Sequence, residues 1–271
     1  MPSLINSPDV LDISPDNSLL RYLAARGHDI YQIDWGSPGL TDAQQDIGGY
    51  ATELLLPLIA RLSRPPILVG YCLGGTIAIA AASLIPCAAL ATIAAPWFFR
   101  AYPESFRSGT HQAWTQAEPV CRNLGVMPME VLQAGFWSLD PRRTIAKYAD
   151  LADMADDNPR LASFLLLEDW VNEGAPMTLA AGHDLIEHFY GADKPGNGQW
   201  IVQGRTIDPA ALPFPTLAVS STTDRIVPDA ARPPATETLR LDLGHVGMIV
   251  GRSARQKLWE PLSAWLSAQG G

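Results

Sequence analysis

The chain has 271 residues, of which 47% are hydrophobic, enough for one α/β domain with an insertion or for two small domains. Acidic residues outnumber basic ones by 28 to 19, and no basic run is present, so nucleic acid is not an expected partner. The three cysteines, Cys72, Cys87 and Cys121, lack Cys-x-x-Cys spacing, which excludes a disulfide framework and structural zinc. Because the first residues do not resemble a signal peptide either, we expect a cytoplasmic location.

The first predicted elements alternate between helix and strand. Ser14, followed by proline, is typical of a helix start. Residues 30–33 (Ile-Tyr-Gln-Ile) are typical of a strand. A capping box at residue 41 predicts a helix over residues 41–62, which Pro57 should kink.

Residues 65–99 carry no charge, and this segment is long enough to cross a bilayer. It contains Pro86, however, and it divides into a strand at 66–69, a helix at 76–82 and a strand at 88–94. A parallel sheet that is covered on both faces produces the same near-continuous apolarity. We therefore expect a buried core and no transmembrane segment.

The alternation stops between residues 97 and 200, a stretch too long for a loop. It contains an acidic run at 150–157 and helical patches at 128–136, 161–172 and 179–190. We interpret it as an inserted helical lid. The predicted organisation is then a core formed by residues 1–96 and 201–271, with a lid formed by residues 97–200.

Strands resume at 216–219 and at about 237–241, and a final helix follows. Strands alternating with helices predict a mostly parallel sheet, and such sheets bind ligands beyond the carboxyl ends of their strands. Cys72, Asp224 and His245 each follow a predicted strand end. We therefore expect these three side chains at one edge of the sheet.

Residues 70–75, Gly-Tyr-Cys-Leu-Gly-Gly, lie between a predicted strand and a predicted helix. This is the layout of a nucleophile elbow with cysteine in place of serine. A Cβ at Gly70 or Gly74 would clash across so sharp a turn. The Cys72 sulfur would project at a helix N-terminus, where the dipole favours the thiolate. The alternative is that Cys72 is an inert buried thiol.

A nucleophilic cysteine needs a base beside it, and the chain offers five histidines. Only His245 lies in a Gly-His-x-Gly turn after the last strand. One of the others precedes an early strand and three fall in the predicted lid: His28, His111, His183 and His188. The order nucleophile, acid, histidine is that of the α/β-hydrolase fold, so His245 is the expected base.

The acid should follow the penultimate strand, as Asp224 does, and Asp229 is its nearest rival. The backbone N–H of Leu73 should form one half of an oxyanion hole, and Ile5, near the first strand end, should supply the second donor. No pattern in the chain predicts a metal site or a bound cofactor.

Taken together, these motifs resemble the catalytic domain of polyhydroxyalkanoate synthases and their shorter α/β-hydrolase relatives. The cysteine box alone does not decide this, because dienelactone hydrolases carry it too, although their chains lack an insertion of this length. The matching segments follow the order of the synthase family along nearly the whole chain: residues 5–6, 10–15, 18–19, 70–75, 167–174, 224–228 and 244–247.

The resemblance implies an α/β-hydrolase fold with a mostly parallel sheet and an inserted helical lid. It also implies Cys72 as the acyl-carrying nucleophile, His245 as general base and Asp224 as its orienting acid. The implied function is an acyltransferase acting on hydroxyacyl thioesters such as coenzyme A derivatives, with association to polyester granules and a homodimer contact through the lid. The alternatives are a hydrolase of thioesters, polyesters or lactones, and an inactive granule- or partner-binding homologue.

Two departures from the family pattern accompany this resemblance. The synthases carry an N-terminal domain, whereas this chain begins almost at the first motif, so we expect a fold truncated on its N-terminal side with an exposed sheet edge. In addition, residues 229–236 are too few for the helix that usually precedes the last strand.

Overall fold

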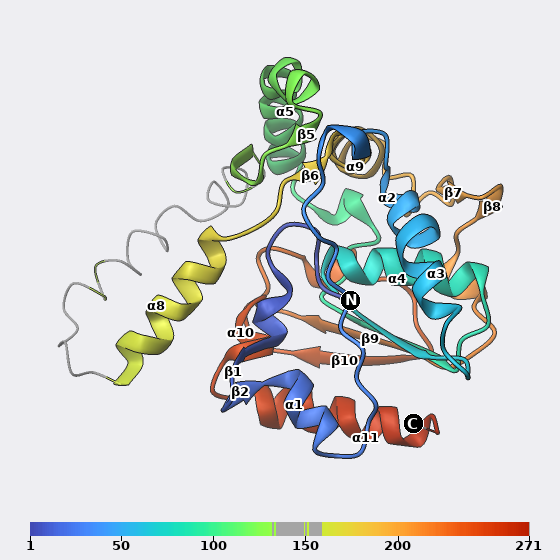
Figure 1. The fold of residues 1–271 in the computed structure, drawn as a ribbon, viewed down its shortest axis with the longest axis vertical. Helices are drawn as coiled ribbons and strands as arrows, with labels where there is room; N and C mark the ends of the chain where they lie inside the picture. The colour runs from blue at the N-terminus through green and yellow to red at the C-terminus, as the bar shows by residue number, and fades with distance from the viewer. Residues whose placement is uncertain (132, 134–148, 150, 152–158, 271) are drawn as a thin grey trace.

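The computed structural model describes residues 1–131, 133, 149, 151 and 159–270 (Figure 1). The end of the predicted helical patch at 128–136 and most of the acidic run at 150–157 lie outside the described residues.

The central sheet has four strands in the order β10-β9-β4-β3, and all its pairings are parallel. The strands are β3 (Ile67–Tyr71), β4 (Ala89–Ile93), β9 (Thr216–Ser221) and β10 (Glu237–Leu241). The two inner strands, β4 and β9, are buried along their whole length, which explains their unbroken apolarity. The predicted parallel sheet is confirmed.

Helices cover both faces of this sheet (Figure 1). Helix α4 (Leu73–Leu84) packs against β3 and β4, and its small residues are almost all buried. Helices α1 (Leu19–Ala24) and α11 (Glu260–Ala268) lie on the opposite face, together with the π-helix η8 (Arg255–Trp259). This two-sided cover is the layered arrangement expected of an α/β domain.

The first helix begins later than the sequence predicts. Residues around Ser14 form a hairpin between β1 (Asp12–Ser14) and β2 (Asn17–Ser18), and α1 starts only at Leu19. The cap is Ser18, whose hydroxyl accepts a hydrogen bond from the Arg21 amide at 2.9 Å. The prediction of a helix start at Ser14 is wrong because the Pro-Asp pair that follows favours a turn.

The strand predicted at 30–33 does not form, and these residues lack regular secondary structure. The first residue of the chain pairs with the edge of β3 instead. The Met1 nitrogen donates to the Val69 carbonyl at 2.7 Å, and the Tyr71 amide donates to the Met1 carbonyl at 2.9 Å. The exposed edge that we expect at β3 is therefore partly covered by the N-terminal segment.

The helix predicted over residues 41–62 is shorter and unevenly wound. It comprises α2 (Ile47–Gly49), the π-helix η3 (Tyr50–Leu55) and α3 (Leu56–Ile59), whereas the capping box falls in the short 3₁₀-helix η2 (Leu40–Asp42). The true cap is Asp46, whose carboxylate accepts from the Gly49 amide at 2.6 Å. Wide π winding directly before Pro57 is a known way to accommodate a disturbed helix ladder.

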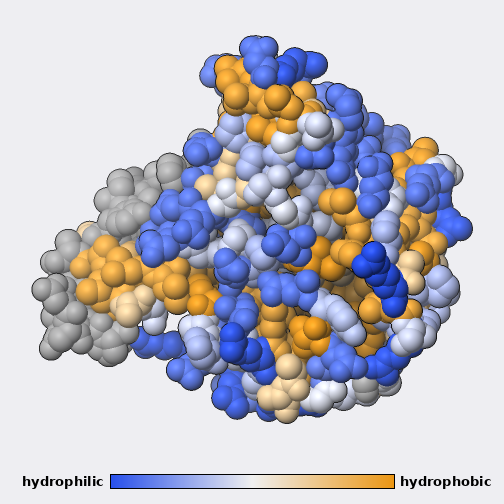
Figure 2. All heavy atoms as spheres, in the orientation of Figure 1, coloured by the Kyte–Doolittle hydropathy of each residue, from blue (hydrophilic) through white to orange (hydrophobic). Residues whose placement is uncertain are grey.

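The described part of residues 97–200 is mainly helical. Its elements are η4 (Phe99–Ala101), α5 (Glu104–Leu124), α8 (Pro159–Asn172), α9 (Leu179–His183) and η5 (Asp184–Gly191), with β5 (Val126–Met127) paired antiparallel to β6 (Met177–Thr178). The helical patches at 161–172 and 179–190 are confirmed, whereas α5 is not among the predicted patches. Figure 2 shows hydrophobic surface over α8, where Leu165 and Leu166 are exposed.

The remaining elements are short. They are η1 (Pro8–Leu11), β7 (Ile201–Val202), β8 (Arg205–Thr206), η6 (Pro209–Ala211), η7 (Asp229–Ala231) and α10 (Gly247–Val250). Between β9 and β10 the chain forms only the single turn of η7, as the short spacing predicts. Among the described residues, no helix combines the length and the apolarity needed to cross a membrane.

Candidate active site

Cys72 lies on a strained turn between β3 and α4. Its φ of 54° and ψ of −132° place it in a conformation that residues with a side chain rarely adopt. Its backbone N–H donates to the Ile93 carbonyl at 2.9 Å, which holds the turn over the end of β4. The turn is as tight as predicted, because a Cβ at Gly70 would overlap the Gly75 backbone. A Cβ at Gly74 would overlap the Pro2 carbonyl.

The predicted oxyanion donors both lie beside Cys72. Leu73 is the first residue of α4, and in the described part of the chain its N–H donates to no backbone carbonyl. Ile5 lines the same pocket as Cys72, and its N–H donates to the Ser3 hydroxyl at 3.3 Å. The oxyanion role of the two amides stays a prediction.

Asp224 and His245 are brought together by the loops that follow β9 and β10. His245 Nδ1 lies 2.7 Å from Asp224 Oδ2, and the Asp224 side chain is fully buried. The other carboxylate oxygen accepts hydrogen bonds from the amides of Ile226, at 2.8 Å, and Val227, at 3.1 Å. These two amides fix the carboxylate so that its second oxygen points at the imidazole.

His245 lies between Asp224 and Cys72. Burial lowers its pKa, but the charges of Asp224 and Cys72 and hydrogen bonds with both side chains outweigh this, so that the pKa is raised to about 10. Since Asp224 occupies Nδ1, the nitrogen left to interact with Cys72 is Nε2. The structure thus brings the three predicted residues together in the order thiol, imidazole, carboxylate.

Asp229, the other candidate acid, interacts with a different set of side chains. Its carboxylate accepts from the Ser220 hydroxyl at 2.7 Å and forms ion pairs with Arg232 and Arg240. It therefore belongs to a polar cluster that links β9, η7 and β10, and Asp224 is the acid beside His245.

Two residues that support the position of His245 are not predicted from the sequence. Tyr71 packs its ring against the His245 ring, and its hydroxyl donates to the His245 carbonyl at 3.3 Å. Ser221, at the end of β9, donates to the Leu243 carbonyl at 2.6 Å and accepts from the Leu243 amide at 3.1 Å. The two hydrogen bonds between Ser221 and Leu243 tie the loop that carries His245 to β9, the strand that precedes Asp224. Tyr71 stands inside the elbow motif, and that position is the one sequence signal that could have identified it.

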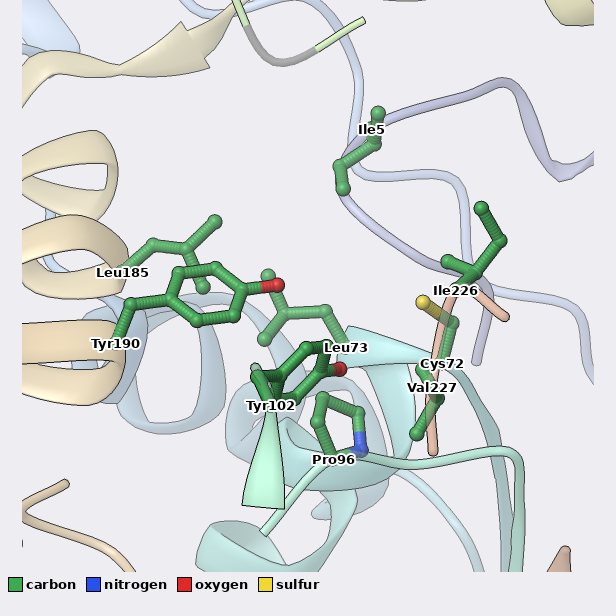
Figure 3. Close-up of a pocket in the computed structure, with 9 residues that line it drawn as sticks. All are labelled: Ile5, Cys72, Leu73, Pro96, Tyr102, Leu185, Tyr190, Ile226 and Val227. Carbon is green, nitrogen blue, oxygen red and sulfur yellow. The ribbon is translucent and has the colours of Figure 1, made fainter. Parts of the chain in front are cut away.

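A narrow, mostly apolar pocket opens beside the Cys72 sulfur (Figure 3). Tyr102 and Tyr190 project into it from residues 97–200, and their rings meet edge to face with centroids 5.0 Å apart. Burial raises the pKa of both phenols, so they stay neutral at ordinary pH. Sequence reasoning assigns neither tyrosine to the site. The apolar lining includes Ile5, Leu73, Leu185, Ile226 and Val227.

A parallel sheet with a nucleophile-type elbow, followed in chain order by an acid and a histidine at strand ends, defines an α/β hydrolase. A model of the alpha/beta hydrolase family matches residues 14–255, and the chain belongs to this family.

Within this family the chain is similar to proteins named poly(3-hydroxyalkanoate) polymerase subunit PhaC. The protein from Haloferax mediterranei is 27% identical over 98% of this chain and 57% of its own length. The protein from Haloarcula marismortui is 25% identical over 98% of this chain and 59% of its own length. The protein from Allochromatium vinosum is 28% identical over 98% of this chain and 79% of its own length. The chain thus spans little more than half the length of the first two relatives. The resemblance predicted from the motifs is confirmed.

Solved structures show the same fold at much lower identity. The monoacylglycerol lipase of Paleococcus ferrophilus superposes with a TM-score of 0.60 at 12% identity, covering 99% of this chain and 93% of the lipase. An extracellular α/β-hydrolase from a Paenibacillus species superposes with a TM-score of 0.57 at 10% identity, covering 99% of this chain and 96% of the hydrolase. These similarities support the fold alone.

Proposed function

We propose that this protein is an acyltransferase of the polyhydroxyalkanoate synthase type that carries its acyl group on Cys72. The observation that carries the proposal is a thiol on the elbow facing a histidine whose other nitrogen lies 2.7 Å from a buried carboxylate. Cysteine, histidine and carboxylate in this relationship form a nucleophile, a base and an orienting group. The names of the relatives point to the same chemistry.

The first half-reaction forms a thioester. The Cys72 thiolate attacks the carbonyl carbon of a hydroxyacyl thioester, and the oxyanion that forms is stabilised by the Leu73 and Ile5 amides. The intermediate collapses with cleavage of the original carbon–sulfur bond. Protonated His245 gives its proton to the departing thiolate, so that free coenzyme A and acyl-Cys72 result.

In the second half-reaction an alcohol replaces the cysteine. His245 takes the proton of the hydroxyl group of another hydroxyacyl unit, whose oxygen attacks the acyl-Cys72 carbonyl. An ester bond forms, and Cys72 leaves as thiolate. Cysteine suits this exchange because a thioester retains more acyl-transfer potential than the oxygen ester that serine would form.

Hydrolysis by the same residues is the second candidate function. It differs only in the acceptor, because water would replace the alcohol at His245. The observation that favours it is the site itself, in which the His245 side chain keeps 9% of its surface exposed. Exclusion of water from the closed site decides between the two outcomes. The third candidate, an inactive binding homologue, predicts no acyl adduct on Cys72.

Residues 97–200 are part of the proposal as the lid over the two core segments, 1–96 and 201–271. This assignment is supported by Tyr102, Leu185 and Tyr190, which reach the pocket from within this stretch. A homodimer contact through exposed Leu165 and Leu166 of α8, and association with polyester granules in the cytoplasm, are proposed on the resemblance to the synthases.

The test is intact-protein mass spectrometry after mixing the chain with 3-hydroxybutyryl coenzyme A. Adducts that grow in whole hydroxyacyl units support the transferase. One transient adduct with accumulating free acid supports the hydrolase instead. A folded protein that forms no adduct and releases no coenzyme A overturns both.

Two variants make the result specific to one thiol. Cys72→Ala should form no adduct. Cys87→Ala should react like the parent, because burial raises the pKa of the Cys87 thiol to about 11 and keeps it unreactive. Loss of the adduct in Cys87→Ala, with retention in Cys72→Ala, would show that Cys87 and not Cys72 carries the acyl group.

A further inference from the structure

The junction between α9 and η5 gathers three metal-ligating side chains away from the Cys72 pocket. His183, Asp184 and His188 each offer one donor atom, and these atoms lie within 4.8 Å of one another. His188 Nδ1 lies 2.6 Å from Asp184 Oδ1. The two imidazole rings stand nearly perpendicular, with centroids 5.2 Å apart.

The winding of the helix is what brings the two histidines together. In an α-helix, residues five apart point about 140° away from each other around the axis. Here the α-helix changes to π winding at Asp184, immediately after His183. The i→i+5 bonding of a π-helix places residues five apart above one another. His183 and His188 are related in this way, and π segments occur frequently at functional sites.

The donor types of the cluster suit a transition metal ion. Asp46 lies close enough for its charge to act on Asp184, so a second carboxylate stands near the two imidazoles. Imidazole nitrogens and carboxylate oxygens are ligands that divalent ions of the zinc type bind.

We propose that His183, Asp184 and His188 bind one divalent transition metal ion of the zinc type. Two imidazoles and one carboxylate are a ligand set that zinc uses, with bond lengths of about 2.0–2.2 Å, and water would complete a tetrahedron. Tetrahedral geometry at these lengths needs donors about 3.4 Å apart, which rotation of the side chains on one short helical segment can supply.

The ion would stiffen a segment of residues 97–200 that already contacts the core. Asp184 Oδ2 already accepts a hydrogen bond from the Ile47 amide, at 3.3 Å, at the start of α2. Leu185 and Tyr190, which line the Cys72 pocket, stand on the same η5 segment. A metal at this junction therefore holds the segment that shapes one wall of the pocket.

The simpler alternative is an ordinary ion pair between Asp184 and His188, which are four residues apart. That ion pair does not involve His183, so the His183→Ala variant separates the two interpretations. The metal proposal does not depend on the acyltransferase function. All measurements are made in a Cys72→Ala background, in which the thiol beside His245 cannot bind zinc.

The experiment is calorimetric titration of the untagged, EDTA-treated full chain with Zn²⁺, paired with the visible absorption spectrum of the Co²⁺ form. We expect one equivalent to bind, with a Co²⁺ spectrum typical of tetrahedral nitrogen and oxygen ligation. His183→Ala and His188→Ala should each weaken Zn²⁺ binding by about 10- to 100-fold or more. His28→Ala is the matched control, because His28 lies beside Ser263 of α11, and it should bind Zn²⁺ like the parent.

Absence of stoichiometric binding in the parent overturns the proposal. So does undiminished affinity in His183→Ala, which would leave only the ion pair. Circular dichroism verifies that each variant is folded. If the variants do not fold, X-ray absorption at the zinc edge of the parent decides, since two imidazoles and a carboxylate give a distinct ligand shell, and any other shell is incompatible with this site.

Discussion

Tyr71 supports His245 through both its ring and its hydroxyl. The two ring centroids lie 5.0 Å apart with an interplanar angle of 31°, and the Tyr71 hydroxyl donates to the His245 carbonyl at 3.3 Å. Because Tyr71 directly precedes Cys72 in the chain, one short segment positions the thiol and braces the imidazole. The backbone of β3 thereby couples two members of the proposed triad.

We therefore expect Tyr71→Phe to preserve the ring contact and lose the hydrogen bond. The free energy of unfolding should fall by about 0.5–1.5 kcal/mol, the usual contribution of one such bond. Tyr71→Ala, which also removes the ring, should lower kcat far more than it raises KM, because it disturbs the base and not the apolar pocket. Equal kcat values for the Ala and Phe variants would contradict a positioning role, and both constants are measured by release of coenzyme A.

Replacement of the buried acid tests the proposed triad. Asp224→Asn keeps the size of the side chain but removes the charge that orients and stabilises protonated His245. We expect the rate of coenzyme A release to fall by about 10²- to 10⁴-fold, the range typical of general acid–base catalysis. Steady-state kinetics with 3-hydroxybutyryl coenzyme A measures the effect.

The matched control is Asp229→Asn, five residues further on. It breaks the ion pairs to Arg232 and Arg240 and should lower stability while leaving the rate within a few-fold of the parent. A greater loss of rate in Asp229→Asn than in Asp224→Asn would show that the rival carboxylate is the functional acid.

The raised pKa of His245 predicts that stability depends on pH. The folded state holds the imidazole proton up to about pH 10, whereas an unfolded histidine releases it near its ordinary value of 6.5. This contribution is therefore complete below about pH 6.5 and is lost as the pH rises towards 10.

Urea unfolding across this range should show a falling free energy of unfolding for the parent. The fall should be smaller for Asp224→Asn and for Cys72→Ala, because each variant removes one of the charges that raise the pKa of His245. Parallel pH profiles for the parent and both variants would disagree with this assignment. Comparison between variants cancels the titration of lysines and tyrosines elsewhere.

Gly74 of the elbow and Gly109 of α5 should respond in opposite ways to replacement by alanine. Gly74→Ala would push a methyl group into the Pro2 carbonyl, so we expect a loss of stability and increased hydrogen exchange over residues 1–6. Gly109→Ala is the control, since no atom lies within 4 Å of its added Cβ and it stands inside α5. It should raise stability by roughly 0.5–1 kcal/mol, as alanine does in helix interiors. Thermal unfolding of the two variants gives the comparison.

The elbow and the strand-end positions of Asp224 and His245 could be read from local patterns. Glycine spacing, apolar runs and chain order depend on neighbours in sequence, and the structure places all three residues together. The errors occur where a local signal competes with another. The Pro-Asp pair after Ser14 forms a turn. Residues 30–33 form no strand, and Met1 pairs with the edge of β3.

By itself, the sequence determined the parallel sheet, the strained turn at Cys72 and the helical character of residues 161–172 and 179–190. These follow from side-chain periodicity and from glycine sterics, which act over a few residues. The tertiary structure alone decided that Tyr71 supports His245 and that His183 and His188 come together. Those contacts join side chains through the pairing of distant strands and through π winding, and neither leaves a period or a spacing that a single sequence displays.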